Sequence, residues 1–301
     1  MNTPINHHAL QSLSAGQYNL AEGIIQHPQS GLLWWTNIHA KELWQLDLRT
    51  GQHRYWSTPQ RVCCFAFTQD DDVLLVAFDA GLALFNTASG AIKRLTPVEP
   101  ETPGTRCNDG RVDRAGNLVF GTMHERSAEA KGHFYRFDTE SRLQQLALPA
   151  IAISNSLAFS PDGGTLYWCD SLQHKIMQCA YDSVTGAIAE ISVFHDLGDT
   201  VIEPDGSTVD AAGYLWNAEW AGHCVTRYAP DGSIDRKIHL PVAQPTCVTF
   251  GGPEQNTLFI TSARAGLDDA ALAQQPEAGS VFALEIPGVR GLPENIWLGE
   301  V

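Results

Sequence analysis

A short strand-like segment recurs six times along the chain, and its even spacing limits the possible fold more than any other feature. Each copy begins with leucine and continues into further apolar residues, as in Leu118-Val119-Phe120 and Leu166-Tyr167-Trp168. The six copies start at Leu32, Leu74, Leu118, Leu166, Leu215 and Leu258, and the steps between them are 42, 44, 48, 49 and 43 residues. A period of about 45 residues is typical of one blade of a β-propeller.

Polar turns precede these strands, and a second hairpin is expected after each of them. The first of these six expected hairpins covers Lys41–Trp56 and the last covers Gly279–Leu292. Four short strands in each repeat predict an all-β, six-bladed propeller, which closes the sheets into a ring without a long exposed edge. We expect a single domain over residues 1–301, in which residues 1–20 supply an outer strand for the last blade. A short helix is predicted over Asp268–Gln275.

The charge of the chain bears on its partners, and its cysteines and N-terminus bear on its compartment. Lys and Arg number 19 against 34 Asp and Glu, which gives a formal charge of −15. Such an acidic surface argues against nucleic acid and anionic membranes as partners. The seven cysteines form no CxxC pair, and the N-terminus lacks the basic and apolar regions of a signal peptide. We therefore expect a cytoplasmic protein, either monomeric or weakly homo-oligomeric.

The start of the strand that lines the central channel can be located by counting back ten or eleven residues from these leucines. In four repeats this register contains an oxygen-bearing side chain, namely Glu22, Asn108, Asn155 and Asp205. In the other two it contains Cys63 or Cys64, and Cys247 or Val248. Any one Asn or Asp alone would be read as a turn residue. Four at one register point instead to a shared site on the channel axis.

Carboxylates and amides that converge in an apolar channel cost free energy unless they are paired or coordinated. A divalent cation would meet that need. Oxygen ligands suit Ca²⁺, Mg²⁺ or Mn²⁺, and Zn²⁺ is also possible.

Several longer motifs extend this reading to nearly the whole chain. They are AEG at 21–23, RCNDGRVDRAGNLVFGTM at 106–123, SNSLAFSPDGGTLYWCDS at 154–171, PDGSTVDAAGYLW at 204–216 and QPEAGSVF at 275–282. In these motifs and their order the chain resembles the gluconolactonase/regucalcin (senescence marker protein) family of sugar lactonases. The resemblance implies a six-bladed propeller with one divalent metal, held by Glu22, Asn155 and Asp205. It also implies that Arg106 and Asn108 contact a sugar lactone.

The chain departs from the family pattern at two places. The family's Ser-Asn-Gly is Ser154-Asn155-Ser156 here, a change that is expected to leave Asn155 in place. Some relatives have an acidic substrate-binding residue shortly after Gly-Thr-Met, but an ungapped match puts Arg126 at that position, with Glu125 one residue earlier. We take Glu125 as the candidate substrate contact, while Arg126, or neither residue, remains open.

The expected reaction is the metal-dependent hydrolysis of an aldonolactone of the glucono-, xylono-, arabino- or galactonolactone type. In this scheme the metal polarises the lactone carbonyl, and Asp205, together with the metal, activates the attacking water. One alternative is a calcium-binding regulatory propeller without important catalysis. Another is a hydrolase of other esters or of phosphotriesters. No GxSxG elbow supports a serine hydrolase, and no HExxH motif or P-loop is present.

Overall fold

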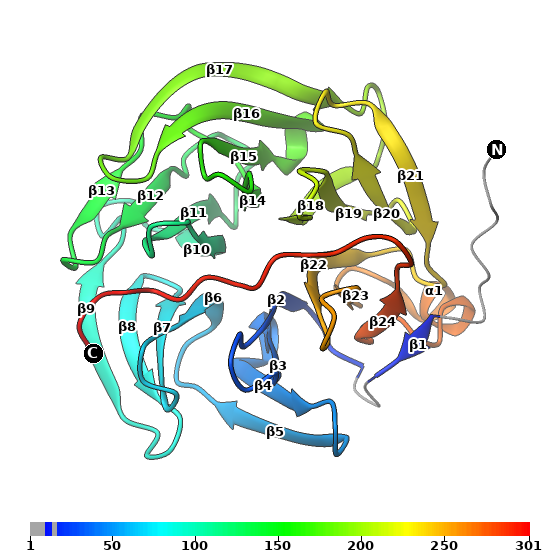
Figure 1. Ribbon diagram of the computed structural model, residues 1–301, viewed down its shortest axis with the longest axis horizontal. Coiled ribbons are helices and arrows are strands. Elements are labelled where there is room, and N and C mark those ends of the chain that lie inside the picture. Colours follow the sequence, from blue (N-terminus) through cyan, green and yellow to red (C-terminus); the bar gives the residue numbers. More distant parts are fainter. Residues whose placement is uncertain (1–9, 14–16) are drawn as a thin grey trace.

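Six four-stranded antiparallel sheets are arranged in a ring in the computed structural model, which describes residues 10–13 and 17–301 (Figure 1). Blade one contains β2 (Ala21–Gln26), β3 (Leu33–Asn37), β4 (Glu42–Asp47) and β5 (Gln52–Ser57). Blade two contains β6 (Val62–Phe67), β7 (Val73–Phe78), β8 (Gly81–Asn86) and β9 (Ile92–Pro97). Blade three contains β10 (Thr105–Val112), β11 (Leu118–His124), β12 (Phe134–Phe137) and β13 (Leu143–Gln145).

The other three blades follow the same plan. Blade four contains β14 (Ser154–Phe159), β15 (Thr165–Asp170), β16 (Lys175–Asp182) and β17 (Ala187–Asp196). Blade five contains β18 (Glu203–Val209), β19 (Leu215–Trp220), β20 (Cys224–Tyr228) and β21 (Ile234–His239). Blade six contains β22 (Pro245–Gly251), β23 (Thr257–Ser262), β24 (Phe282–Glu285) and β1 (Gln11–Ser12). The predicted six-bladed propeller is therefore confirmed.

The burial of the strands explains the recurring apolar segments. The inner strand and the second strand of a blade are buried on both faces, as in β6 and β7, because each blade packs against its two neighbours. The outer strands β9 and β17 are largely exposed. Hydrophobic clusters fill the spaces between neighbouring blades, for example between blades three and four and between blades four and five. The core is thus a ring of interfaces around the channel.

The ring is closed by strands from the two ends of the chain. β1 pairs antiparallel with β24, with Gln11 opposite Ala283 and Ser12 opposite Phe282. The remainder of the expected closing segment includes residues 1–9 and 14–16, which lie outside the described residues.

The predicted hairpin over Gly279–Leu292 is wrong, because only β24 forms there. Pro287 has no main-chain N–H to donate, and Gly288 adopts φ +76° in the turn that follows β24. The chain leaves the sheet at this turn, and β1 occupies the outer position of the blade.

Residues 292–301 form a C-terminal strap that crosses one face of the ring from blade six to blade two (Figure 1, red). Trp297 is fully buried between blades two and three, where its main-chain N–H donates to Phe67 O at 2.8 Å and its ring stacks on Phe137. Leu298 N–H donates to Gly116 O at 3.1 Å. The strap therefore links blades that are far apart around the ring.

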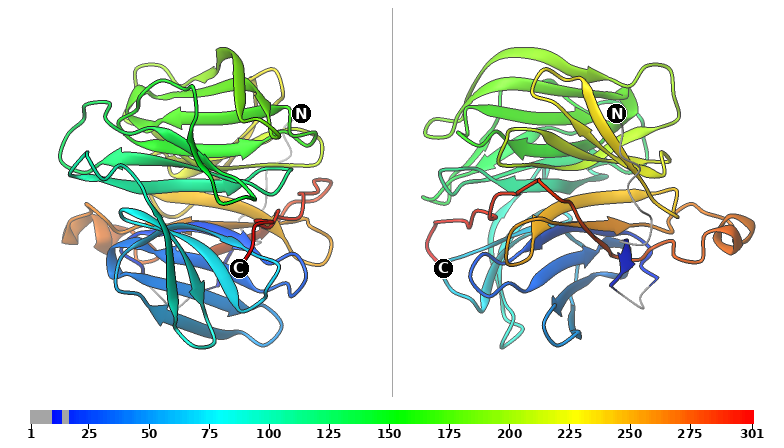
Figure 2. Two further views of the ribbon diagram at one scale, coloured as in Figure 1. Left: turned by 90° about the vertical axis from the view of Figure 1, so that its left-hand side faces the viewer. Right: turned by 45° about the vertical axis from the view of Figure 1, so that its right-hand side comes forward.

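The predicted helix is confirmed as α1 (Asp269–Gln274), and Asp268 caps it by accepting a hydrogen bond from Ala271 N–H. Figure 2 shows α1 and the C-terminal strap on opposite faces of the ring. Two short 3₁₀ turns, η2 (Ile38–Ala40) and η3 (Ser171–Gln173), lie between the second and third strands of blades one and four. Among the described residues, no helix is long and apolar enough to cross a membrane.

Candidate active site

A β-bulge lies near the start of the inner strand in each of the six blades. At this point the strand register shifts in β2, β6, β10, β14, β18 and β22. Bulges turn side chains out of the regular alternation and are common beside active sites. The four residues predicted from the register, Glu22, Asn108, Asn155 and Asp205, all lie at these bulges. The repeat pattern and the bulges thus locate the same rim of the channel.

Two of the bulges contain a residue in the left-handed region of φ. In blade one this residue is Gly23, with φ +58°, directly after Glu22. In blade four the equivalent residue is Ser156, with φ +64°, directly after Asn155. This conformation explains why glycine is suited to the position that Ser156 occupies here. Asn155 lies at the bulge of β14 and is 6% exposed.

Glu22 and Asp205 form the acidic centre of the site. Asp205 is 6% exposed, and burial raises its pKa well above the ordinary value, with a further increase from the charge of Glu22. Burial, and then the charge of Asp109, raise the pKa of Glu22 to about 8. Neither residue has an ion-pair partner at the site among the described residues. The charge of Arg106 only partly offsets the rise in the pKa of Glu22, because burial is the larger effect.

The amide of Asn155 is oriented by its hydrogen bonds. Its Nδ2 donates to Ser171 Oγ at 3.0 Å, and Ser171 Oγ in turn donates to Pro204 O at 2.8 Å. Because the Ser171 hydroxyl proton is used on Pro204, Ser171 must accept from Asn155. The Asn155 Oδ1 atom accordingly faces Asn108, whose Nδ2 donates to it at 3.2 Å.

Arg106 and Asn108 lie beside this centre on β10. Arg106 Nη1 donates to Asn108 Oδ1 at 2.7 Å and to Cys107 O at 2.8 Å, and Arg106 Nε donates to Glu125 Oε1 at 3.3 Å. The remaining guanidinium nitrogen, Nη2, has no hydrogen-bond partner among the described residues. The structure thus brings Arg106, Asn108 and Glu125 together next to the acidic centre.

Glu125 and Arg126 differ in their surroundings. Glu125 contacts Arg106 and also Arg61 of blade two, and the hydrogen bonds from Arg61 lower the pKa of Glu125, which favours the ionised carboxylate. The side chain of Arg126 is exposed, and its main-chain N–H donates to His124 Nδ1 at 3.3 Å. Of the two, Glu125 is the residue joined to the other candidate side chains.

The residues at the rim fit a divalent cation. Asp205 Oδ1 is buried and has no hydrogen-bond partner in the described part of the chain, which is costly for an ionised oxygen. Glu22 and Asn155 add a carboxylate and an amide oxygen at the same register. Among the described residues, no group of three His, Cys, Asp or Glu side chains could hold a metal by itself. A cation at this rim would therefore need the amide oxygen of Asn155 as well.

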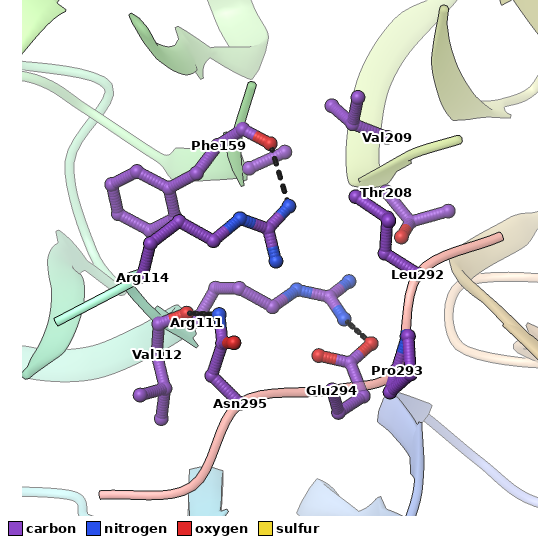
Figure 3. Close-up of a pocket in the computed structure, with 11 residues that line it drawn as sticks. Arg111, Val112, Arg114, Phe159, Thr208, Val209, Leu292, Pro293, Glu294 and Asn295 are labelled. Carbon is purple, nitrogen blue, oxygen red and sulfur yellow. Dashed lines mark hydrogen bonds and ion pairs between the residues drawn. The ribbon is translucent and has the colours of Figure 1, made fainter. Parts of the chain in front are cut away.

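A cavity lies at the end of the channel opposite the bulges, where the inner strands end (Figure 3). Arg111 and Arg114 extend into it side by side, but both are already engaged. Arg111 pairs with Glu294 of the C-terminal strap, while Arg114 donates to Phe159 O and Ser160 O at 3.2 Å. The Arg111–Glu294 pair joins the strap to β10, and both guanidinium groups are bound to protein atoms, so we do not take this cavity as the candidate site.

Sequence reasoning missed two charged residues near the rim. Asp109 is a buried carboxylate that accepts from Leu157 N–H and Gly110 N–H, each at 2.8 Å. Arg61 directly precedes β6 and pairs with Glu125. A signal for Arg61 was present, since Arg61-Val62-Cys63-Cys64 in blade two aligns with Arg106-Cys107-Asn108-Asp109 in blade three. The two arginines occupy equivalent positions in neighbouring repeats.

Comparison with known proteins gives matches over nearly the whole chain. Residues 20–264 match the family model described as the SMP-30/Gluconolactonase/LRE-like region. An L-arabinolactonase of Azospirillum brasilense is 45% identical over 269 residues, 88% of each chain. A 6-deoxy-6-sulfogluconolactonase of Pseudomonas putida is 33% identical over 269 residues, 89% of this chain and 91% of that protein. A solved structure of regucalcin, a calcium-binding protein from Agrobacterium tumefaciens, has a TM-score of 0.90 at 36% identity and covers 95% of this chain and 96% of its own.

Proposed function

Because the chain belongs to the SMP-30/gluconolactonase/LRE-like family, we propose that it is a sugar lactonase. The reaction would hydrolyse the ester bond of a sugar-derived aldonolactone and release the aldonic acid. The observation that carries the proposal is the buried Oδ1 of Asp205, which has no hydrogen-bond partner among the described residues and lies at the same rim as Glu22 and Asn155. A site of this kind needs a cation, and Arg106 and Asn108 supply hydrogen-bonding groups for a sugar beside it.

Glu22, Asn155 and Asp205 would hold one divalent metal ion. When bound, the metal would polarise the lactone carbonyl and make a bound water more acidic. The oxygen-only donor set favours Ca²⁺ over Zn²⁺, and Mn²⁺ and Mg²⁺ remain competing choices. The calcium-binding regucalcin structure supports Ca²⁺ as the first ion to test.

The protein's own groups would position the substrate and take up the proton. Arg106 would donate from Nη2 to an oxygen of the lactone, while Asn108 would contact a hydroxyl group of the sugar. The carboxylate of Asp205 would accept the proton of the attacking water. Glu125, ionised between Arg61 and Arg106, would accept a hydrogen bond from another hydroxyl.

For the substrate class we propose a five-carbon aldonolactone first. The L-arabinolactonase shares 45% of its residues with this chain over most of both proteins, which supports a pentonolactone over a hexonolactone. We further propose a cytoplasmic enzyme. The seven cysteines, all buried and free, support a reducing compartment.

One experiment tests the proposed function and both alternatives. Metal-stripped protein is supplied in turn with Ca²⁺, Mn²⁺, Mg²⁺ or Zn²⁺ and assayed for acid release from L-arabinono-, D-xylono-, D-glucono- and D-galactonolactone, with an aryl ester and a phosphotriester in parallel. We expect hydrolysis of a pentonolactone well above the spontaneous rate, and only after a metal is added. Binding of Ca²⁺ without hydrolysis would favour a regulatory propeller, whereas turnover of only the ester or phosphotriester would assign a different hydrolase.

A further inference from the structure

Arg61 occupies a defined place at the channel rim. It directly precedes the inner strand of blade two, as Arg106 lies just ahead of the bulge on the inner strand of blade three. Its side chain is 22% exposed. Arg61 is therefore a largely buried residue, and its side chain reaches Glu125 of the neighbouring blade.

Two carboxylates bind Arg61, one from its own blade and one from the next blade. Asp79, in the turn between β7 and β8, accepts from Arg61 main-chain N–H at 3.0 Å and pairs with Nε. Glu125, which follows β11 of the next blade, accepts from Nη1 at 2.5 Å and from Nη2 at 3.0 Å. Such a two-point contact between a planar guanidinium and a carboxylate fixes both distance and orientation.

The contact continues from Glu125 into the candidate site. Glu125 Oε1 accepts from Arg106 Nε at 3.3 Å, and Arg106 Nη1 donates to Asn108 Oδ1 at 2.7 Å. Asn108 Nδ2 then donates to Asn155 Oδ1 at 3.2 Å. An unbroken chain of hydrogen bonds thus runs from Asp79 through Arg61 to Asn155.

Counting donors and acceptors along this chain shows what is left for a ligand. A carboxylate has about four acceptor sites, of which Oε1 of Glu125 uses two and Oε2 uses one. One acceptor site on Oε2 is therefore free. On Arg106, Nη2 is the nitrogen without a partner among the described residues. The free acceptor site on Glu125 and the two N–H groups of Arg106 Nη2 match a hydroxyl-bearing ring, because a hydroxyl both donates and accepts.

We propose that Arg61 is a positioning residue, which holds the Glu125 carboxylate against Arg106 so that the pair recognises hydroxyl groups of the sugar lactone. The proposal rests on the proposed function. Arg61 does not contact the reacting atoms, so its loss would weaken substrate binding more than the chemical step. Loss of Asp205, in contrast, would slow the chemical step.

The test compares kcat and KM of Arg61→Gln and Arg61→Lys with those of the wild-type holoenzyme on the best pentonolactone. We expect Arg61→Gln to raise KM roughly tenfold and leave kcat within about threefold, since it removes charge-assisted hydrogen bonds to a ground-state binding group. Arg61→Lys keeps the charge and loses the planar contact, so an intermediate KM is expected.

The second part of the test uses the variant Glu125→Gln. If Arg61 acts through Glu125, the double variant Arg61→Gln/Glu125→Gln will have a KM close to that of Glu125→Gln alone. Arg142→Gln is the matched control, because Arg142 also bridges two carboxylates, Asp138 and Glu140, but lies on blade three away from the channel. Its KM should equal that of the wild type.

The possible results separate this proposal from the proposed function. If the wild type hydrolyses a lactone and Arg61→Gln keeps its KM, the positioning role is wrong and the lactonase assignment stands. Additive effects of the two substitutions, or a fall in kcat alone, would also overturn it. If the wild type hydrolyses none of the lactones, the proposed function fails, and the role given to Arg61 fails with it.

Discussion

The hydroxyl of Ser156 donates a hydrogen bond to the main-chain carbonyl of Asp205 over 2.8 Å. Ser156 directly follows Asn155 in blade four, and Asp205 belongs to blade five. The bond therefore holds the backbone next to one candidate metal ligand against the backbone of another. Asn217 Nδ2 donates to the same hydroxyl at 2.8 Å and to the same carbonyl at 2.7 Å. Serine at this position thus adds a cross-link that glycine could not form.

Substitutions of Ser156 should separate this hydrogen bond from the cost of the backbone conformation. Ser156→Ala keeps a side chain at φ +64° and loses the hydroxyl, so we expect a loss of about 1–2 kcal/mol in the free energy of unfolding. Ser156→Gly loses the same bond but relieves a strain of about 1 kcal/mol, so it should be less destabilised. Denaturant unfolding of the three proteins measures this order. An alanine variant as stable as the glycine variant would contradict it.

The raised pKa of Glu22 predicts how the metal-free protein responds to pH. A folded-state pKa of about 8 against an ordinary value of 4.5 means that the folded protein keeps a proton that the unfolded chain releases. The contribution to stability is complete below pH 4.5 and is lost as pH rises toward 8. The melting temperature measured in a chelator should therefore fall between these pH values.

Two comparisons check that this pH dependence comes from the acidic centre. Glu22→Gln should flatten the decline, since the amide does not titrate. Saturating metal should raise the melting temperature more at pH 8 than at pH 5, because the metal binds the ionised carboxylates. A decline that persists unchanged in Glu22→Gln would assign it to other groups.

The C-terminal strap is expected to contribute strongly to stability through Trp297. This ring is fully buried, and Nε1 donates to Asp138 O at 3.2 Å. Trp297→Ala should cost about 3–5 kcal/mol, the usual range for deletion of a buried aromatic ring. Leu298→Ala is a suitable comparison because Leu298 is 46% exposed, and it should cost much less. Equal losses in the free energy of unfolding for the two variants would show that the strap does not depend on the packing of Trp297.

The blade pattern could be predicted because it is local. Leu118 and Leu215 begin the second strands of their blades, and the turns before them are encoded within a few residues. The strand pairing that closes the ring was harder to predict from the sequence, since β1 and β24 lie at opposite ends of the chain. The final hairpin was predicted wrongly because Gly288 makes a turn that leads out of the sheet instead of back along it.

In the candidate site, too, local features could be predicted and long-range contacts could not. Asn155 and Asp205 were found because each has a fixed offset from a recognisable strand. Arg61 was missed, since its importance comes from Glu125 of another blade, 64 residues away in sequence. The left-handed conformation of Ser156 was likewise visible only in the structure.

The most direct test of the central claim is the turnover of L-arabinonolactone by Asp205→Asn in the presence of the activating metal. The substitution keeps the shape of the side chain but removes the charge and the basic oxygen. We expect kcat to fall by at least about a hundredfold, the usual effect of losing a general base, with the melting temperature of the metal-free protein unchanged or higher. An Asp205→Asn variant that hydrolyses the lactone at the wild-type rate would contradict the assignment of this rim as the active site.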